Sequence, residues 1–90
     1  MPSNRTLTLA ENALDDLRYL TAKNPKTAQK ILKLIAEITR SPFTGTGKPE
    51  PLQHLKPNTW SRRINLEHRI VYEVSDSEIR IVQCRYHYQR

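Results

Sequence analysis

The sequence predicts an α+β fold with the element order βααβββ, in which two helices pack on one face of a twisted, mainly antiparallel sheet. Residues 5–10 alternate apolar and polar positions, as a strand does. Residues 11–41 carry apolar residues at helical spacing, and residues 59–86 return to strand-like runs separated by short turns. At 90 residues the chain is expected to form one domain, 1–90, with a small core.

The N-terminal part predicts one strand and two helices. After the strand, residues 11–24 form the first helix, with acidic residues in its first turns, where the helix dipole favours them. Asn24 and Pro25 are typical of an N-cap and the first residue of a second helix, which ends before Pro42. The apolar residues expected to face the sheet are Leu14, Leu17 and Leu20, then Ala28, Ile31, Leu32, Ile35 and Ile38.

Residues 41–58 predict a long loop, because they hold both glycines and four of the six prolines. Loops of this length in compact domains are usually functional or disordered. Pro49 and Pro51 flank Glu50 and restrict its backbone, which favours a rigid, functional loop.

Three strands are expected over 59–65, 68–74 and 78–86, with turns near Leu66-Glu67 and Ser75-Asp76-Ser77. If both turns hold an odd number of residues, one face carries Arg63, Arg69, Val71, Gln83, Arg85 and His87. The core face then carries Trp60, Ile64, Ile70, Tyr72, Val74, Val82, Cys84 and Tyr86. An even turn would place Arg63 opposite Ile70, so the odd register is preferred. It leaves Ile79 and Ile81 on the polar face, and places Arg62, His68 and Arg80 on the core face, reaching water past its rim.

Charge favours a polyanionic partner. The net charge is +6 and is spread evenly along the chain, which suits nucleic acid, an acidic protein or an anionic membrane surface. Lys26, Lys30 and Lys33 line one face of the second helix, either as a solvated face or as a phosphate-contacting stripe. The single Cys84 and the absence of a long apolar run predict a cytoplasmic protein that spans no membrane.

An acid, a base and arginines on one face suit cleavage of RNA. A base must take the proton of the 2′-OH, an acid must protonate the leaving 5′ oxygen, and cations must stabilise the phosphate. Glu50 is the candidate base and His87 the candidate acid, since an ordinary histidine has a pKa near ~6.5. The alternatives remain open: Glu50 as a solvated loop acid, and His87 as an ordinary terminal residue. Tyr88 could stack on a base or cap the edge of the core.

No cofactor or metal is expected. His54, His68, His87 and Cys84 lack paired ligand spacing, and "GTGKPE" lacks the length of a phosphate-binding P-loop.

The strings "SPFTGTGKPEPLQH", "WSRRINLEHRIVYEV" and "CRYHY" together resemble the Txe/YoeB family of toxins, within the RelE-like superfamily. The resemblance implies the toxin of a type II toxin–antitoxin pair that cuts mRNA in the ribosomal A site without a metal. It implies Glu50 as general base, His87 as general acid and Arg69 as stabiliser of the transition state. Phosphate would be held by Arg63, with Arg62 and Lys48 as further candidates, and Tyr88 would orient the substrate.

The resemblance also implies partners: a YefM-like antitoxin, the ribosome with its mRNA, and a second copy in a homodimer. Two other functions stay open from the residues. One is a catalytically silent ribosome- or RNA-binding protein that blocks translation, and the other is a relative of the same fold that poisons DNA gyrase.

Overall fold

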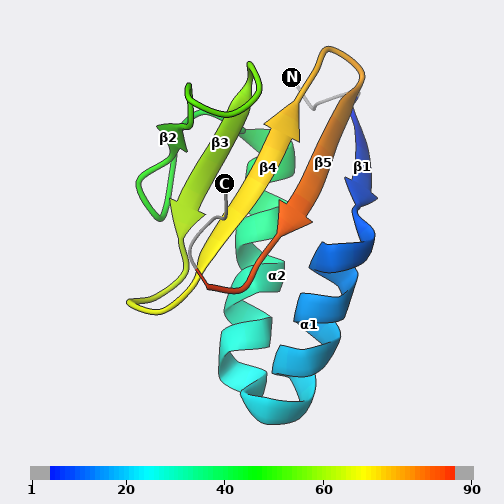
Figure 1. Ribbon diagram of the computed structural model, residues 1–90, viewed down its shortest axis with the longest axis vertical. Coiled ribbons are helices and arrows are strands. Elements are labelled where there is room, and N and C mark those ends of the chain that lie inside the picture. Colours follow the sequence, from blue (N-terminus) through cyan, green and yellow to red (C-terminus); the bar gives the residue numbers. More distant parts are fainter. Residues whose placement is uncertain (1–4, 87–90) are drawn as a thin grey trace.

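The computed structural model describes residues 5–86, and its element order is the predicted one with one short strand added. The elements are β1 (Thr6–Leu9), α1 (Glu11–Lys23), α2 (Pro25–Arg40), β2 (Glu50–Pro51), β3 (Thr59–Arg63), β4 (Arg69–Val74) and β5 (Glu78–Gln83). The five strands form one sheet in the order β1-β5-β4-β3-β2, and both helices cover one of its faces (Figure 1). The pair β1–β5 is parallel and all other pairs are antiparallel, which confirms the predicted α+β fold with a mainly antiparallel sheet.

The boundary between the two helices follows the predicted cap. Asn24 ends α1 through a hydrogen bond from its N–H to Leu20 O, and its side-chain oxygen accepts from Thr27 N at 3.3 Å. Pro25 stands at the first position of α2, where a missing N–H costs no helical bond. The two helices therefore form an antiparallel pair joined by a single residue.

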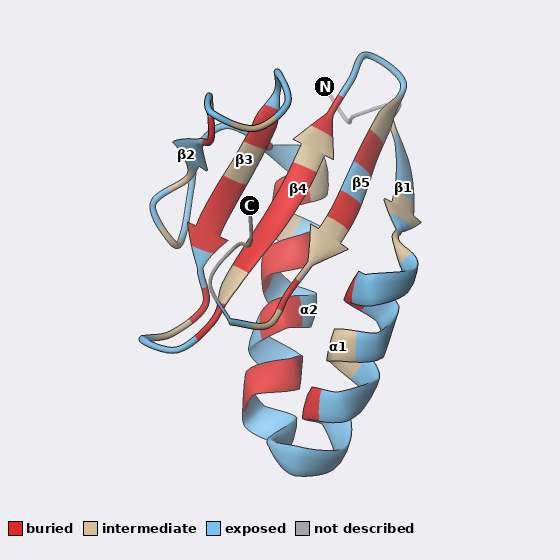
Figure 2. Ribbon diagram, in the orientation of Figure 1, coloured by how far each residue is buried: buried red, intermediate tan, exposed pale blue. Residues whose placement is uncertain are grey.

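The core lies between α2 and the central strands, as the buried residues in Figure 2 show. Two predicted core positions are wrong, because Leu14 and Leu32 are 45% and 53% exposed. Ala13 and Leu34 are buried in their place, one or two positions along each helix. The buried cluster comprises Ala13, Leu20, Ala28, Ile31, Leu34, Ile35, Ile38, Ile64, Ile70, Tyr72, Val74, Ile79, Ile81 and Cys84.

The register between β3 and β4 confirms the odd turn predicted there. Arg63 pairs with Arg69 and Ser61 with Val71, so these residues share the face away from the helices, called the open face below. Trp60 faces the helices and packs against the core, as predicted.

The register between β4 and β5 corrects the second prediction. The turn is even, since Ser75 N donates to Glu78 O across Asp76 and Ser77. Val74 therefore pairs with Ile79 and Tyr72 with Ile81, and both isoleucines are fully buried in the core. Arg80 pairs with Glu73 and is exposed, so its expected place on the core face was wrong as well.

A β-bulge restores the predicted register at the end of β5. Tyr72 pairs with Ile81 but Val71 pairs with Gln83, which leaves Val82 as the extra residue. Beyond the bulge Cys84 is in the core, as predicted, and burial raises the pKa of its thiol to about 12, with Asp16 acting in the same direction. Val82 was expected in the core and instead lines a hollow on the open face.

Candidate active site

Glu50, Ser61 and Arg69 form a polar cluster on the open face. Arg69 Nη2 lies 3.3 Å from Glu50 Oε1, and the Ser61 hydroxyl accepts from Arg69 Nη2 at 3.0 Å and from Nε at 3.3 Å. Ser61 is fully buried, the Arg69 side chain is 15% exposed, and the Glu50 side chain is 64% exposed. The guanidinium is thus anchored from below, while the carboxylate beside it is accessible to solvent.

Backbone pairing explains why Glu50 reaches this place. Glu50 and Pro51 form the short strand β2, in which Glu50 pairs with Ser61 and Pro51 with Trp60. This strand was not predicted, because two residues are too few to show a periodicity. The predicted stiffness of the segment agrees with its position as a paired edge strand, where proline is tolerated.

Lys48 and Arg63 are both exposed, and Arg63 pairs with Arg69 across β3 and β4. Gly47 O accepts from Arg63 N at 2.7 Å, which ties the loop to the end of β3. Gly47 has a φ of 86°, and a Cβ there would come within 2.7 Å of Arg63 O. With Lys30 of α2, Lys48 and Arg63 line one hollow of about 240 Å³. The structure therefore brings two of the predicted phosphate-binding side chains together.

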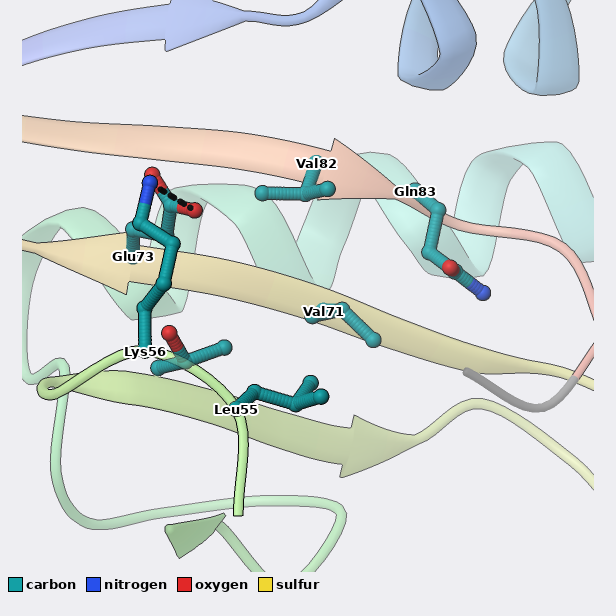
Figure 3. Close-up of a pocket in the computed structure, with 7 residues that line it drawn as sticks. Leu55, Lys56, Val71, Glu73, Val82 and Gln83 are labelled. Carbon is teal, nitrogen blue, oxygen red and sulfur yellow. Dashed lines mark ion pairs between the residues drawn. The ribbon is translucent and has the colours of Figure 1, made fainter. Parts of the chain in front are cut away.

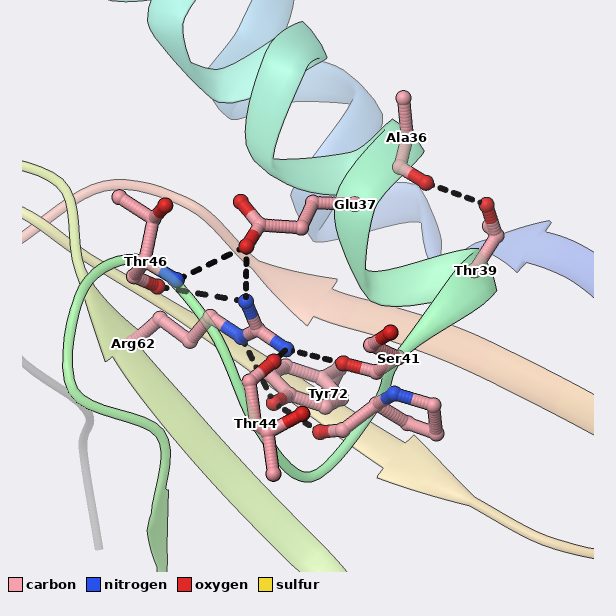
Figure 4. Close-up of polar contacts among 9 residues, drawn as sticks. Ala36, Glu37, Thr39, Ser41, Thr44, Thr46, Arg62 and Tyr72 are labelled. Atoms are coloured by element: carbon pink, nitrogen blue, oxygen red, sulfur yellow. Dashed lines mark hydrogen bonds and ion pairs between the residues drawn. The ribbon is translucent and has the colours of Figure 1, made fainter.

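Arg62 has a different environment from the one predicted (Figure 4). Its side chain is fully buried and donates to the Tyr72 hydroxyl at 3.1 Å and to the carbonyls of Ser41, Thr44 and Thr46. Its Nη1 also lies 3.7 Å from Glu37 Oε2. Both the phosphate contact and the expectation that Arg62 reaches water were wrong, because every nitrogen of its guanidinium is engaged inside the protein.

The network around Arg62 continues through Tyr72 and Glu37. The Tyr72 hydroxyl donates to Pro42 O at 2.6 Å, and burial raises the pKa of that phenol, although its hydrogen bond with Arg62 acts in the opposite direction. Thr46 N donates to Glu37 Oε2 at 2.9 Å, and this bond holds the pKa of Glu37 below its ordinary value, assisted by the charge of Arg62. Residues 41–47 are therefore held against α2 and the sheet.

His68 holds the segment that follows β5 through a hydrogen bond from Tyr86. The imidazole is buried, and its Nδ1 accepts from Tyr86 N at 2.7 Å, while Tyr86 O accepts from Arg69 N at 2.9 Å. Tyr86 has a φ of 61° and is 47% exposed, so its expected place in the core was wrong. Arg85, expected on the open face, stacks on Tyr19 of α1 at 3.5 Å from the ring centre.

His87 and Tyr88 lie outside the residues that the structure describes, and their predicted roles stay predictions. Sequence reasoning missed two residues of this site, Ser61 and His68. The alternation of "TWSRR" carried a signal for Ser61, because it shares a face with Arg63. The sequence predicts that His68 reaches water at the rim of the core, whereas the structure shows its side chain buried.

The comparisons with known proteins agree with one another. Residues 9–88 match the model of the family described as YoeB-like toxin of bacterial type II toxin-antitoxin systems. Toxin YoeB of Mycobacterium bovis is 46% identical over 84 residues, covering 93% of this chain and 99% of the relative.

Two solved structures from Staphylococcus aureus are similar over 96% of this chain and 100% of theirs. The YoeB dimer is 39% identical with a TM-score of 0.85, and the toxin in the heterotetrameric YoeB-YefM complex is 39% identical with a TM-score of 0.81. With the family model matching most of its length and a close relative matching end to end, this chain belongs to the YoeB-like toxins of bacterial type II toxin–antitoxin systems.

Proposed function

We propose that this toxin is a ribosome-dependent endoribonuclease that cuts mRNA in the A site and thereby inhibits translation. The observation that carries the proposal is the pairing of the accessible Glu50 carboxylate with the anchored Arg69 guanidinium, at 3.3 Å. A carboxylate can take a proton, and a fixed cation beside it can stabilise the negative charge that develops at the same linkage. RNA supplies its own nucleophile, the 2′-OH, so no metal-bound water is needed.

In the proposed reaction, Glu50 takes the proton of the 2′-OH and that oxygen attacks the adjacent phosphorus. The bond from phosphorus to the 5′ oxygen breaks, and His87 gives a proton to the leaving oxygen. The products are a 2′,3′-cyclic phosphate and a 5′-hydroxyl. Arg69, held by Ser61, stabilises the charge on the pentavalent phosphate.

Arg63 and Lys48 are proposed to hold phosphates of the bound strand, because both are exposed beside the cluster and line one hollow. Arg62 has no part in this role and supports the loop instead. Tyr88 is proposed to orient or stack against the substrate.

The proposed partners are a YefM-like antitoxin and a second copy of the chain, alongside the ribosome and its mRNA. The relatives solved as a YoeB-YefM complex and as a YoeB dimer support the first two. Leu7 and Leu9 of the edge strand β1 and Leu14 of α1 are 38–45% exposed, which suits burial in a dimer. Within residues 5–86, no helix is long and apolar enough to cross a membrane. The proposed location is the cytoplasm.

Primer extension on mRNA in a reconstituted translation reaction tests the cleavage. The wild type is expected to cut within the A-site codon. Glu50→Gln is expected to lower the rate at saturation by about 10²–10⁴ with ribosome binding retained, and His87→Ala by a similar factor. Arg69→Gln is expected to lower it by about 10²–10³. Arg80→Gln, an exposed arginine of the neighbouring strand, and Glu11→Gln, an exposed acid of α1, are the matched controls and should cut as the wild type does.

The same variants separate the alternatives. If Glu50→Gln, Arg69→Gln and His87→Ala all arrest translation as strongly as the wild type, occupancy of the ribosome explains the toxicity better than cleavage. DNA damage on expression without any cut mRNA would indicate action on gyrase.

A further inference from the structure

Near the Glu50–Arg69 pair, the open face carries a hollow of about 240 Å³ that is separate from the one lined by Lys48 and Arg63 and that none of the proposed roles uses (Figure 3). Leu55 and Lys56 come to it from the loop before β3, and the other residues come from the three central strands. Its lining residues are Leu55, Lys56, Thr59, Val71, Glu73, Val82 and Gln83.

The bulge in β5 shapes this hollow. In a regular strand Val82 and Gln83 would point to opposite faces. Because Val82 is the extra residue of the bulge, both side chains reach the open face, and Figure 3 shows them beside Val71. Leu55 approaches from the opposite side, so the hollow has apolar walls on two sides. The Lys56–Glu73 ion pair, at 3.3 Å, lies at its polar end.

Thr59 gives the hollow an unsatisfied polar group. The residue is only 4% exposed, and its hydroxyl oxygen has no hydrogen-bond partner among the described residues. A buried hydroxyl without a partner is unfavourable, and native structures rarely keep one without a reason. The oxygen is closed off from solvent in this structure, so the Thr59 side chain has to turn toward the hollow for a ligand there to offer it a donor or an acceptor and remove the penalty.

The hollow is continuous with the site of the proposed reaction. Thr59 and Glu73 pair across β3 and β4, and the next pair on the same face is Ser61 and Val71. Same-face residues of a strand are about 7 Å apart. Ser61 is the residue that anchors Arg69, so the hollow begins one residue pair away from the cluster.

We propose that this hollow binds one nucleobase of the RNA strand, adjacent to the scissile linkage, and that Thr59 hydrogen-bonds the edge of that base; this rests on the proposed nuclease function. The hollow is smaller than the ~300–1,000 Å³ of pockets for drug-sized ligands, which suits a single ring system. Bases extruded from a strand are held between apolar side chains and read at their polar edges. An aliphatic side chain of a protein partner would fit the walls but leave the Thr59 hydroxyl unpaired, and a phosphate would meet apolar walls.

The test compares cleavage of four mRNAs that differ only in the base at one position flanking the cut, each flanking position being varied in turn. Thr59→Val keeps the shape of the side chain and removes its hydroxyl. We expect the ratio of cleavage rates between the best and worst base to change by about 3- to 10-fold, the value of one hydrogen bond. Thr8→Val, on the distant strand β1, is the matched control and should keep the ratios of the wild type.

A second pair of variants fills the hollow. Val82→Phe and Leu55→Phe place a ring where the base would lie, and each is expected to raise KM about 10-fold or more for all four mRNAs. The two residues belong to different segments, so a folding defect in one variant, detected by circular dichroism, leaves the other as the test. Binding of the antitoxin is measured in parallel for every variant.

The outcomes are distinct. If the wild type cuts mRNA while Thr59→Val keeps its base ratios and the filled variants keep its KM, the hollow is no base site. If the filled variants lose only affinity for the antitoxin, the hollow takes a protein side chain and the proposal is overturned. If the wild type itself cuts no mRNA, the proposed function fails first and the base site fails with it.

Discussion

Arg62 and Arg63 are adjacent on β3 and differ completely in environment. The first is fully buried, with its guanidinium bonded to four oxygen atoms and near Glu37, whereas the second is exposed beside Lys48. Strand alternation sends the two side chains to opposite faces. The pair therefore separates a residue that supports the loop from one available to a ligand.

Replacing each arginine by glutamine is expected to affect different properties. Arg62→Gln leaves several buried oxygens without a donor and should lower the free energy of unfolding by about 3–5 kcal/mol. Arg63→Gln should change it by no more than about 0.5 kcal/mol, because the site is exposed. Urea denaturation followed by circular dichroism measures both, and equal losses would contradict the assignment of Arg62 to the interior.

His68 presents a second prediction at the scale of one residue. Asparagine can place its side-chain oxygen close to the position of Nδ1, whereas glutamine places its amide near that of Nε2. His68→Asn should therefore keep the bond from Tyr86 N, and His68→Gln should lose it. Hydrogen exchange at the Tyr86 amide, followed by NMR, should be about 5- to 10-fold faster in His68→Gln, as expected for the loss of about 1 kcal/mol. Unchanged protection in His68→Gln would show that the bond does not hold this segment.

At the scale of elements, the segment 41–47 depends on α2 for its position. Thr46 N donates to Glu37 Oε2, and Arg62 joins the carbonyls of this segment to β3. Gly47 then passes the chain to β3 through its bond from Arg63 N. Glu37 therefore helps to position Glu50 indirectly, because it holds the loop segment that leads into β2.

The lowered pKa of Glu37 predicts how stability changes with pH. Because the hydrogen bond from Thr46 N and the charges of Arg62 and Arg40 lower the folded pKa, the ionised form stabilises the folded state. This stabilisation is present above the unfolded pKa and is lost as the pH falls through the folded pKa. Free energies of unfolding from pH 7 downward should show a gap between wild type and Glu37→Gln that closes in acid. A gap that stays constant with pH would exclude ionisation as its cause.

Local pattern was sufficient to predict most of the elements. The Asn24-Pro25 boundary, the two helices and the three C-terminal strands were readable in the sequence, and the structure confirms them. The pairing of β4 with β5 was not, because a two-residue turn followed by a bulge changes the face of Ile79 and Ile81 and then restores it at Cys84. Alternation alone cannot locate an extra residue within a strand.

At the scale of the whole molecule, the net charge of +6 predicts salt-sensitive binding to RNA. In a Glu50→Gln background, which slows cleavage, the logarithm of the affinity for single-stranded RNA should fall linearly with the logarithm of the salt concentration. Removing one phosphate contact with Arg63→Gln should reduce the slope by about 0.7. Lys23→Gln, at the far end of α1, is the control and should leave it unchanged. Equal slopes for all variants would show that Arg63 makes no contact with an RNA phosphate.

The candidate site was predictable where its residues stand in specific strings. Glu50 between two prolines, Arg63 and Arg69 were chosen from the sequence, and the structure brings Glu50 and Arg69 to within 3.3 Å. Ser61, which anchors Arg69, and the buried His68 were not assigned these places, because the first contact crosses from β3 to β4 and the second joins the β3–β4 loop to the segment after β5.

The sequence by itself determined the class of fold, the limits of the helices and the family, because periodicity, caps and motif strings are properties of neighbouring residues. Only the tertiary structure decided which of two adjacent arginines is buried and which face Ile79 and Ile81 occupy. It also decided that the Thr59 hydroxyl has no hydrogen-bond partner among residues 5–86. These outcomes depend on how the segment 41–47 and the bulged β5 meet the rest of the sheet. The hydrogen bonds from the segment 41–47 to Glu37, Arg62 and Tyr72 join residues that are 9 to 30 positions apart, and no local pattern encodes such contacts.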